Sequence, residues 1–191
     1  GKYYVQEIAT DEHYVLNGEK YLVTFEYMGQ DIQTVDIDCG EFENVIKRGR
    51  IEGHKTDDKS EPLENALFGL FRTDCTEFTE SNAIMTAISD EKGYFEFGNI
   101  PYGEYVVREI KAPTGYILSD ESYPVSISED GEVIEITAEN KPITVKISKR
   151  DIYGNELKGA KMQIIDSEGN IVDEWTSDGT DHIVTELPAG D

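Results

Sequence analysis

The feature that most constrains the fold is that the sequence repeats itself, with a period a little under one hundred residues. Equivalent positions lie between 94 and 102 residues apart (149 − 55 = 94 and 109 − 7 = 102). A fixed period marks an array, and this one is long enough for each unit to be a small domain. Three pairs of segments carry the match: 1–8 with 103–110, 42–44 with 138–140, and 55–57 with 149–151.

The repeat predicts one complete unit between two half-units. Residues 48–142 would form the complete unit, residues 1–47 the C-terminal half of a unit, and residues 143–191 the N-terminal half of another. The linkers at 45–50 and 141–143 are short, so the complete unit has little room to fold back along its neighbours.

Within the complete unit, short apolar or alternating segments predict β-strands and no helix. Turn sequences such as 90–93 and 129–131 separate these segments, and no stretch keeps a period of 3.6 residues. Seven short strands at this spacing are typical of an antiparallel, immunoglobulin-like β-sandwich with Greek-key connections. The predicted strands are 50–56, 66–73, 83–88, 93–98, 104–110, 122–128 and 132–139.

Composition limits the classes of partner. Lys and Arg number 17 against 40 Asp and Glu, a formal net charge of -23, which argues against binding nucleic acid or an anionic membrane. No apolar run reaches the length of a membrane span, and neither a signal peptide nor a cell-wall sorting motif is present. A fragment of a larger exported protein would look like this. Cys39 and Cys75 are too few for a disulfide framework, and whether they are bonded is left open.

Three polar residues stand where strand alternation calls for an apolar side chain. A single polar residue at a strand end is usually half-buried, with a lysine reaching water or an asparagine capping a turn. Recurrence of the three at repeat-equivalent positions favours a shared buried site instead. Each closes an inward-facing stripe: Ile51, Gly53 and Lys55; Tyr105, Val107 and Glu109; Ile134, Ile136, Ala138 and Asn140.

A buried lysine, glutamate and asparagine can react with one another. Desolvation lowers the pKa of a lysine and raises the pKa of a glutamate, so that both can be neutral together. The neutral amine of Lys55 is a nucleophile and the carboxamide carbon of Asn140 an electrophile. A protonated Glu109 could stabilise the developing oxyanion and carry protons to the leaving ammonia. The product would be a Lys55–Asn140 amide that forms once, with no cofactor.

These residues give the chain a resemblance to the Cna B-type (CnaB, prealbumin-like) domains of Gram-positive adhesins and pilins. Three motifs carry it: Lys-x-Asp at 55–57 with the Leu-x-Asn-Ala follow-on at 63–66, the box Tyr-x-x-x-Glu-x-x-Ala-Pro-x-Gly-Tyr at 105–116, and the terminal Asn140.

The resemblance implies tandem prealbumin-like sandwiches in the stalk of a cell-wall-anchored surface protein. It also implies an autocatalytic isopeptide bond between Lys55 and Asn140 with Glu109 as catalyst, and neighbouring domains of the same array as partners.

The half-units depart from this pattern. The first keeps Glu7 as catalyst and Asn44 as acyl partner, but residues 9–14 replace the Ala-Pro-x-Gly-Tyr turn and its lysine lies outside the chain. The last keeps Lys149 but stops before its Glu and Asn. One interpretation is that the two halves complement each other between copies of the chain. The other is that they are the incomplete ends of a longer array. A pilin polymerisation motif is not recognisable.

Other functions remain as alternatives. An enzyme is disfavoured because His13, His54 and His182 are scattered and no catalytic motif is present. Acidic turns at 57–58, 129–130 and 178–179 lack the ordered spacing of a calcium loop, so no metal is expected. A ligand-binding adhesive module, with a host-matrix ligand, would use an end loop such as 74–82, where an aromatic is expected to be exposed among polar residues.

Overall fold

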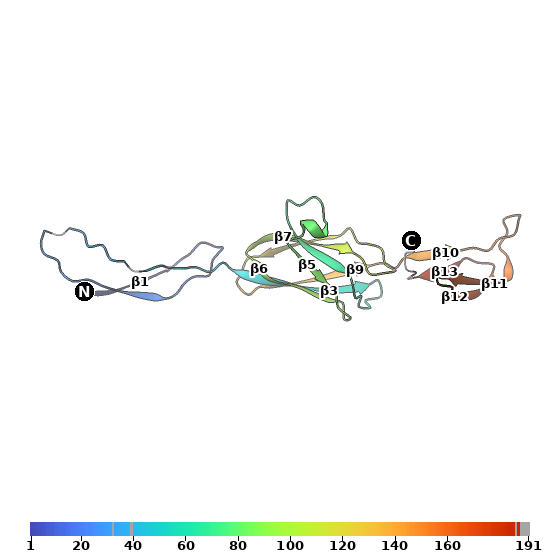
Figure 1. Cartoon of the computed structure of the whole chain (residues 1–191), viewed down its shortest axis with the longest axis horizontal. Coiled ribbons are helices and arrows are strands. Elements are labelled where there is room, and N and C mark those ends of the chain that lie inside the picture. Colours follow the sequence, from blue (N-terminus) through green and yellow to red (C-terminus); the bar gives the residue numbers. More distant parts are fainter. Residues whose placement is uncertain (32, 39, 186, 188–191) are drawn as a thin grey trace.

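The structure is a computed structural model that describes residues 1–31, 33–38, 40–185 and 187. Figure 1 shows three parts in a row: a thin ribbon at the N-terminal end, a sandwich in the centre, and a smaller group of strands at the C-terminal end. Nearly all of the regular secondary structure is strand. The all-β fold class predicted from the sequence is confirmed.

Seven strands form the central sandwich, close to the seven segments expected. They build a three-stranded sheet in the order β6-β3-β9 and a four-stranded sheet in the order β5-β4-β7-β8. A short 3-10 helix, η1 (Glu80–Asn82), lies between β4 and β5. The strands are β3 (Arg48–Asp57), β4 (Leu67–Arg72), β5 (Met85–Ile88), β6 (Tyr94–Pro101), β7 (Gly103–Lys111), β8 (Ser122–Ile127) and β9 (Val133–Asn140).

One strand pair corrects the expectation that the sandwich is antiparallel throughout. The first and last strands, β3 and β9, run parallel, with Lys55 opposite Ala138 and Asp57 opposite Asn140. A hairpin forces two strands to be antiparallel, but β3 and β9 are joined through five other strands and both sheets, so either direction is open to them. The parallel register brings the C-terminal ends of both strands to the same end of the sandwich.

Aromatic rings fill the core beneath the site. Phe68 and Phe95 stack with ring centroids 3.9 Å apart, one from each sheet. Gly53 lies opposite Phe95 on the neighbouring strand, and a Cβ there would come within 2.1 Å of that ring. Position 53 therefore requires glycine, because the ring of Phe95 fills the space that a side chain would occupy. The ring of Phe95 thus lies against Gly53 of β3 and stacks on Phe68 of the facing sheet.

The end segments are smaller and more open. In the N-terminal segment, β1 (Lys2–Gln6) pairs with β2 (Lys20–Thr24). In the C-terminal segment, β10 (Thr144–Ile147) pairs with β13 (His182–Thr185), and β11 (Lys158–Ile165) pairs with β12 (Ile171–Asp178). Both leave large apolar side chains exposed, among them Tyr4, Ile8, Leu22, Tyr27, Ile165 and Ile171.

Two equivalent hydrogen bonds hold the junctions between the parts. The amide of Ile143 donates to the carbonyl of Gly115 (2.8 Å), and the amide of Lys47 donates to the carbonyl of His13 (2.8 Å). The turn at 9–14 thus accepts the same kind of hydrogen bond from the following linker as the Ala-Pro-Thr-Gly-Tyr turn at 112–116, although their sequences differ. The ammonium of Lys47 also pairs with Glu129 at 3.0 Å, which ties the first linker to the sandwich.

The loop at 74–82 does not display its aromatic as expected. Phe78 is half-buried, packs edge-on against Phe71 with centroids 5.0 Å apart, and lies under the guanidinium of Arg108. Its ring extends the core, which corrects the expectation that an exposed aromatic is offered to a ligand. Cys75 is a free thiol, and Cys39 lies outside the described residues. In the described part of the chain, no helix has the length and apolar character needed to cross a membrane.

Candidate functional site

Three polar side chains meet inside the central sandwich. Lys55 on β3 is 1% exposed, Asn140 at the end of β9 is 2% exposed, and Glu109 on β7 is 4% exposed. The parallel register puts Lys55 and Asn140 on the same face of one sheet, near the ends of neighbouring strands. Glu109 reaches them from the facing sheet. Strand alternation buries all three, because each follows apolar or glycine residues at two-residue spacing.

Hydrogen bonds fix the amide of Asn140 against the carboxyl of Glu109. Asn140 Nδ2 donates to Glu109 Oε2 (2.8 Å) and to the carbonyl of Ile117 (2.8 Å). The backbone amide of Ser119 donates to the same Oε2 atom (2.9 Å). The nitrogen that would leave as ammonia therefore already touches the carboxyl that would protonate it.

The amine of Lys55 donates to two backbone carbonyls and, within the described part of the chain, to no side-chain acceptor. Lys55 Nζ donates to the carbonyl of Thr56 (2.8 Å) and to that of Ala138 (3.2 Å), the residue two before Asn140 on β9. Burial lowers the pKa of Lys55 from 10.5 to about 8, against the opposing influence of Glu109 and two other carboxylates nearby. Roughly one amine in ten is then neutral at pH 7, which is the nucleophilic form.

Two buried acceptor atoms in the site have no hydrogen-bond donor among the residues that the structure describes. These are Glu109 Oε1 and Asn140 Oδ1. An unsatisfied buried polar atom costs on the order of 1–3 kcal/mol, so each of these two atoms would gain from a hydrogen-bond donor. A protonated carboxyl pairs with a primary amide through two hydrogen bonds, one in each direction. Nδ2 to Oε2 is the first of these, and a proton on Oε1 would donate the second.

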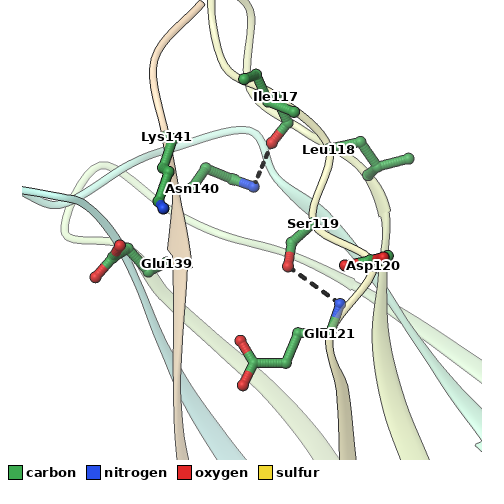
Figure 2. A pocket seen from close by; sticks show the side chains of 8 residues that line it. All are labelled: Ile117, Leu118, Ser119, Asp120, Glu121, Glu139, Asn140 and Lys141. Carbon is green, nitrogen blue, oxygen red and sulfur yellow. Dashed lines mark hydrogen bonds between the residues drawn. The ribbon is translucent and has the colours of Figure 1, made fainter.

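A surface pocket of about 280 Å³ lies beside the site, and Asn140 is the one member of the trio in its lining. Segments 117–121 and 139–141 line it, and Figure 2 shows the side-chain nitrogen of Asn140 directed at the carbonyl of Ile117 within it.

The N-terminal segment repeats half of this arrangement. Asn44 Nδ2 donates to Glu7 Oε2 (2.9 Å) and to the carbonyl of Val15 (3.2 Å), while the backbone amide of Asn17 donates to Glu7 Oε2 (2.8 Å). Val15 and Asn17 lie eight and ten residues after Glu7, as Ile117 and Ser119 do after Glu109. Both Glu7 and Asn44 are only half-buried.

Figure 1 shows β1 and β10 in the two end parts, on opposite sides of the central sandwich. Glu7 directly follows β1 and is hydrogen-bonded to Asn44, whereas Lys149 follows β10, so one chain does not bring these three together. The local fold of Lys149 nevertheless copies that of Lys55. The amide of Leu157 donates to the carbonyl of Lys149 (2.7 Å), as the amide of Leu63 does to the carbonyl of Lys55 (2.9 Å). The side chain of Lys149 is half-buried and follows the inward stripe of β10.

Sequence reasoning missed the backbone groups that hold the trio. The carbonyl of Ile117 and the amide of Ser119 fix the amide and the carboxyl, yet neither side chain carries a signal of its own. The sequence signals these two backbone groups only through their constant spacing after the glutamate in both copies of the repeat. Among the described residues, no group of three or more His, Cys, Asp or Glu is arranged to hold a metal ion.

Two curated bacterial proteins are similar to this chain, and one of them is named as a surface protein. The chain is 29% identical over 139 residues to the trypsin-resistant surface T6 protein of Streptococcus pyogenes serotype M6, covering 68% of this chain and 25% of that protein. It is 33% identical over 110 residues to the serine-aspartate repeat-containing protein E of Staphylococcus aureus, covering 58% of this chain and 8% of that protein. The chain thus spans a quarter or less of these relatives.

A solved structure and a family model define the fold more closely. The Bacillus anthracis TIE protein aligns with all of this chain and 35% of its own, at 26% identity and a TM-score of 0.68. The model of the SpaA family, described as a prealbumin-like fold domain, matches residues 49–142, a range that contains Lys55, Glu109 and Asn140. This confirms the resemblance seen in the sequence. Residues 49–142 of the chain belong to the SpaA family of prealbumin-like fold domains.

Proposed function

We propose that this chain is part of the stalk of a Gram-positive cell-surface protein, and that its central sandwich is locked by an amide formed between Lys55 and Asn140. The proposal is based on the burial of an amine, a carboxyl and a carboxamide in one core. Two of these groups are already in contact, because Asn140 Nδ2 donates a hydrogen bond to Glu109 Oε2. The surface relatives support the location. The reaction takes place once in each chain, so the module is not an enzyme that turns over a substrate.

The reaction follows from the contacts of the three side chains. The neutral amine of Lys55 attacks Cγ of Asn140, a bond forms between Nζ and Cγ, and a protonated Glu109 stabilises the oxygen that becomes negative. Glu109 then relays the proton lost by Nζ to Nδ2, because it already accepts a hydrogen bond from that atom. The bond between Cγ and Nδ2 breaks, and ammonia leaves. The folded core supplies the proximity that an enzyme obtains by binding a substrate.

The position of the amide explains how it would serve a stalk. Tension applied through the neighbouring parts enters β3 at Arg48 and leaves β9 at Asn140. With the amide in place, the force runs along β3 to Lys55 and crosses directly to Asn140. The 85-residue loop between them (140 − 55 = 85) then carries no load. Hydrogen bonds between strands yield under tension, whereas a covalent amide does not.

Single-molecule pulling on the full chain tests this function. Handles at the two ends would stretch the wild-type chain and a Glu109→Ala chain, which lacks the acid-base group. The variant should show one additional unfolding step of about 290 Å, the extended length of 85 residues. Steps common to both chains belong to the flanking segments and serve as an internal control. A wild-type chain that shows the same additional step is not locked, and the stalk proposal would then be wrong.

A further inference from the structure

The outward face of the four-stranded sheet carries a second, smaller apolar cluster. Strand alternation turns Phe71 of β4 and Ile110 of β7 away from the central core, because the residues before them face inward. Phe71 is nevertheless fully buried. A Cβ at Gly69 would lie 2.5 Å from the ring of Phe71 and 2.8 Å from Ile110, so this cluster is closely packed. A further segment must therefore cover the outside of the sheet.

The loop between β4 and β5, residues 73–84, provides this cover. Phe78 in the loop packs against Phe71 with ring centroids 5.0 Å apart. The loop is held by its own contacts, since Asn82 Nδ2 donates to the carbonyl of Glu77 (2.9 Å). In Figure 1 the loop, with η1, stands out from the sandwich beside β7. The ring of Phe78 is thus fixed against the outward face of the sheet.

Arg108 lies on the same outward face and has no charged partner in the described part of the chain. It is half-buried, and its guanidinium lies 4.5 Å from the centroid of the Phe78 ring. The described residues give this guanidinium no hydrogen bond and no ion pair, although the chain has 40 acidic residues against 17 basic ones. A guanidinium on the face of a ring keeps N–H groups that can donate two parallel hydrogen bonds to a carboxylate. Arg108 is therefore held in place and still able to bind.

The guanidinium lines a pocket of about 390 Å³ between the loop 73–84, β7 and the segment that follows the Ala-Pro-Thr-Gly-Tyr turn. This pocket shares Leu118, Ser119 and Asp120 with the pocket of Figure 2, but Asn140 is not in its lining. The backbone amide of Ser119 donates to Glu109 (2.9 Å), which fixes this wall of the pocket to β7. The volume is within the range of pockets that bind small groups.

The lining indicates a ligand that has one carboxylate beside an apolar group. Arg108 supplies the paired donors, and the hydroxyls of Thr76 and Ser119 are further donors in the lining. Ile110 and Leu118 form an apolar wall, and Leu118 is 52% exposed. A few placed polar groups against apolar side chains are the usual composition of a binding pocket.

Charge and the covered ring disfavour other anions. The net charge of -23 repels a polyanion, and so does the exposed Asp120 in the lining. Glu109 also lines the pocket, but its Oε2 atom is engaged inside the sandwich by Asn140 and by the amide of Ser119. The ring of Phe78 is occupied by Arg108, which leaves little of it for a sugar to stack on. An acidic side chain of a peptide fits this combination best.

We propose that this pocket binds the side-chain carboxylate of a protein partner that carries an apolar residue next to the acidic one. Arg108 is the anchor, and Phe78 positions its guanidinium. The central sandwich would then bind a partner in addition to bearing tension. The proposal does not depend on the amide between Lys55 and Asn140, so either can fail without the other.

NMR spectroscopy of the isotope-labelled full chain tests the proposal. The blocked dipeptide acetyl-leucyl-glutamyl-amide should give saturable shifts of the Arg108 Nε resonance and of the Thr76 and Ser119 amides. The matched neutral probe, acetyl-leucyl-glutaminyl-amide, should bind about tenfold more weakly, because it cannot form charge-assisted hydrogen bonds. Glucuronate, which carries its carboxylate on a sugar, should give no saturable shift.

Three variants separate the anchor from its surroundings. Arg108→Gln should remove binding of the acidic dipeptide, whereas Arg72→Gln, on the neighbouring strand and outside the pocket, should leave it unchanged. Asp120→Asn removes a repelling carboxylate and should tighten binding, a gain that a misfolded chain would not show.

The proposal is refuted if the acidic dipeptide gives no saturable shift in the pocket, if the neutral probe binds equally well, or if Arg108→Gln binds unchanged. Glucuronate binding at Arg108 without binding of the dipeptide would mean that the partner is not a peptide, and the proposal would be wrong.

Discussion

The stability that the Lys55–Asn140 amide adds can be isolated with a double-mutant cycle. Lys55→Met and Glu109→Gln each prevent the bond while nearly preserving the volume of the buried side chain. Closing an 85-residue loop lowers the entropy of the unfolded chain by about 15 cal/mol/K, which is about 4.5 kcal/mol at 25 °C. Each single variant loses this contribution, but the double variant loses it only once. The two single losses should therefore exceed the double loss by about 4.5 kcal/mol.

Urea unfolding of the central sandwich, followed through its buried aromatic residues, measures the four free energies. Lys55 and Glu109 also interact directly, so the cycle must be repeated with Asn140→Ala, a background in which no bond can form. There the coupling should fall to the direct interaction alone, on the order of 1 kcal/mol. Equal coupling in both backgrounds would mean that no covalent bond contributes to stability, and the reasoning would be refuted.

Three further predictions concern the same site. While Glu109 keeps its proton, bond formation after refolding should accelerate as pH rises toward 8, because the pKa of Lys55 is about 8 and the neutral amine attacks; a time course of the mass change would show it. In Glu109→Gln, the amine stays free and loses the neighbouring carboxylate that raises its pKa, so the folded pKa of Lys55 lies at or below about 8, and the unfolded chain binds more protons from there up to its own value of 10.5. Stability should rise with pH there by up to about 1.4 kcal/mol per unit, and a flat urea midpoint would contradict this. Gly93→Ala should slow bond formation and cost on the order of 1–3 kcal/mol, because Gly93 has a φ of +73° and its Cβ would lie 2.2 Å from the carbonyl of Lys55. Gly131→Ala, at a φ of +77° with nothing within 4 Å, is the matched control and should leave the reaction rate unchanged.

The strands and the buried trio could be predicted because local pattern determines both. Alternation along β3, β7 and β9 identified Lys55, Glu109 and Asn140 as inward-facing, and the structure buries them. The repeat then showed that three separate anomalies belong together. Both signals depend on spacing along the chain, which the sequence displays directly.

Features set by tertiary packing could not be predicted in this way. The parallel direction of β3 and β9 depends on how five intervening strands are distributed between two sheets, and no local pattern encodes it. Phe78 looked exposed because its neighbours are polar, yet its ring covers Phe71. The carbonyl of Ile117 is a backbone group, and backbone groups are present at every position of a sequence.

Mass spectrometry of the intact chain is the most direct test of the central claim. The monomer should be about 17 Da lighter than its sequence requires, and a proteolytic digest should contain one branched peptide that joins Lys55 to Asn140. Glu109→Ala should restore the full mass. A wild-type chain of full mass, with Lys55 and Asn140 in separate linear peptides, would contradict the account.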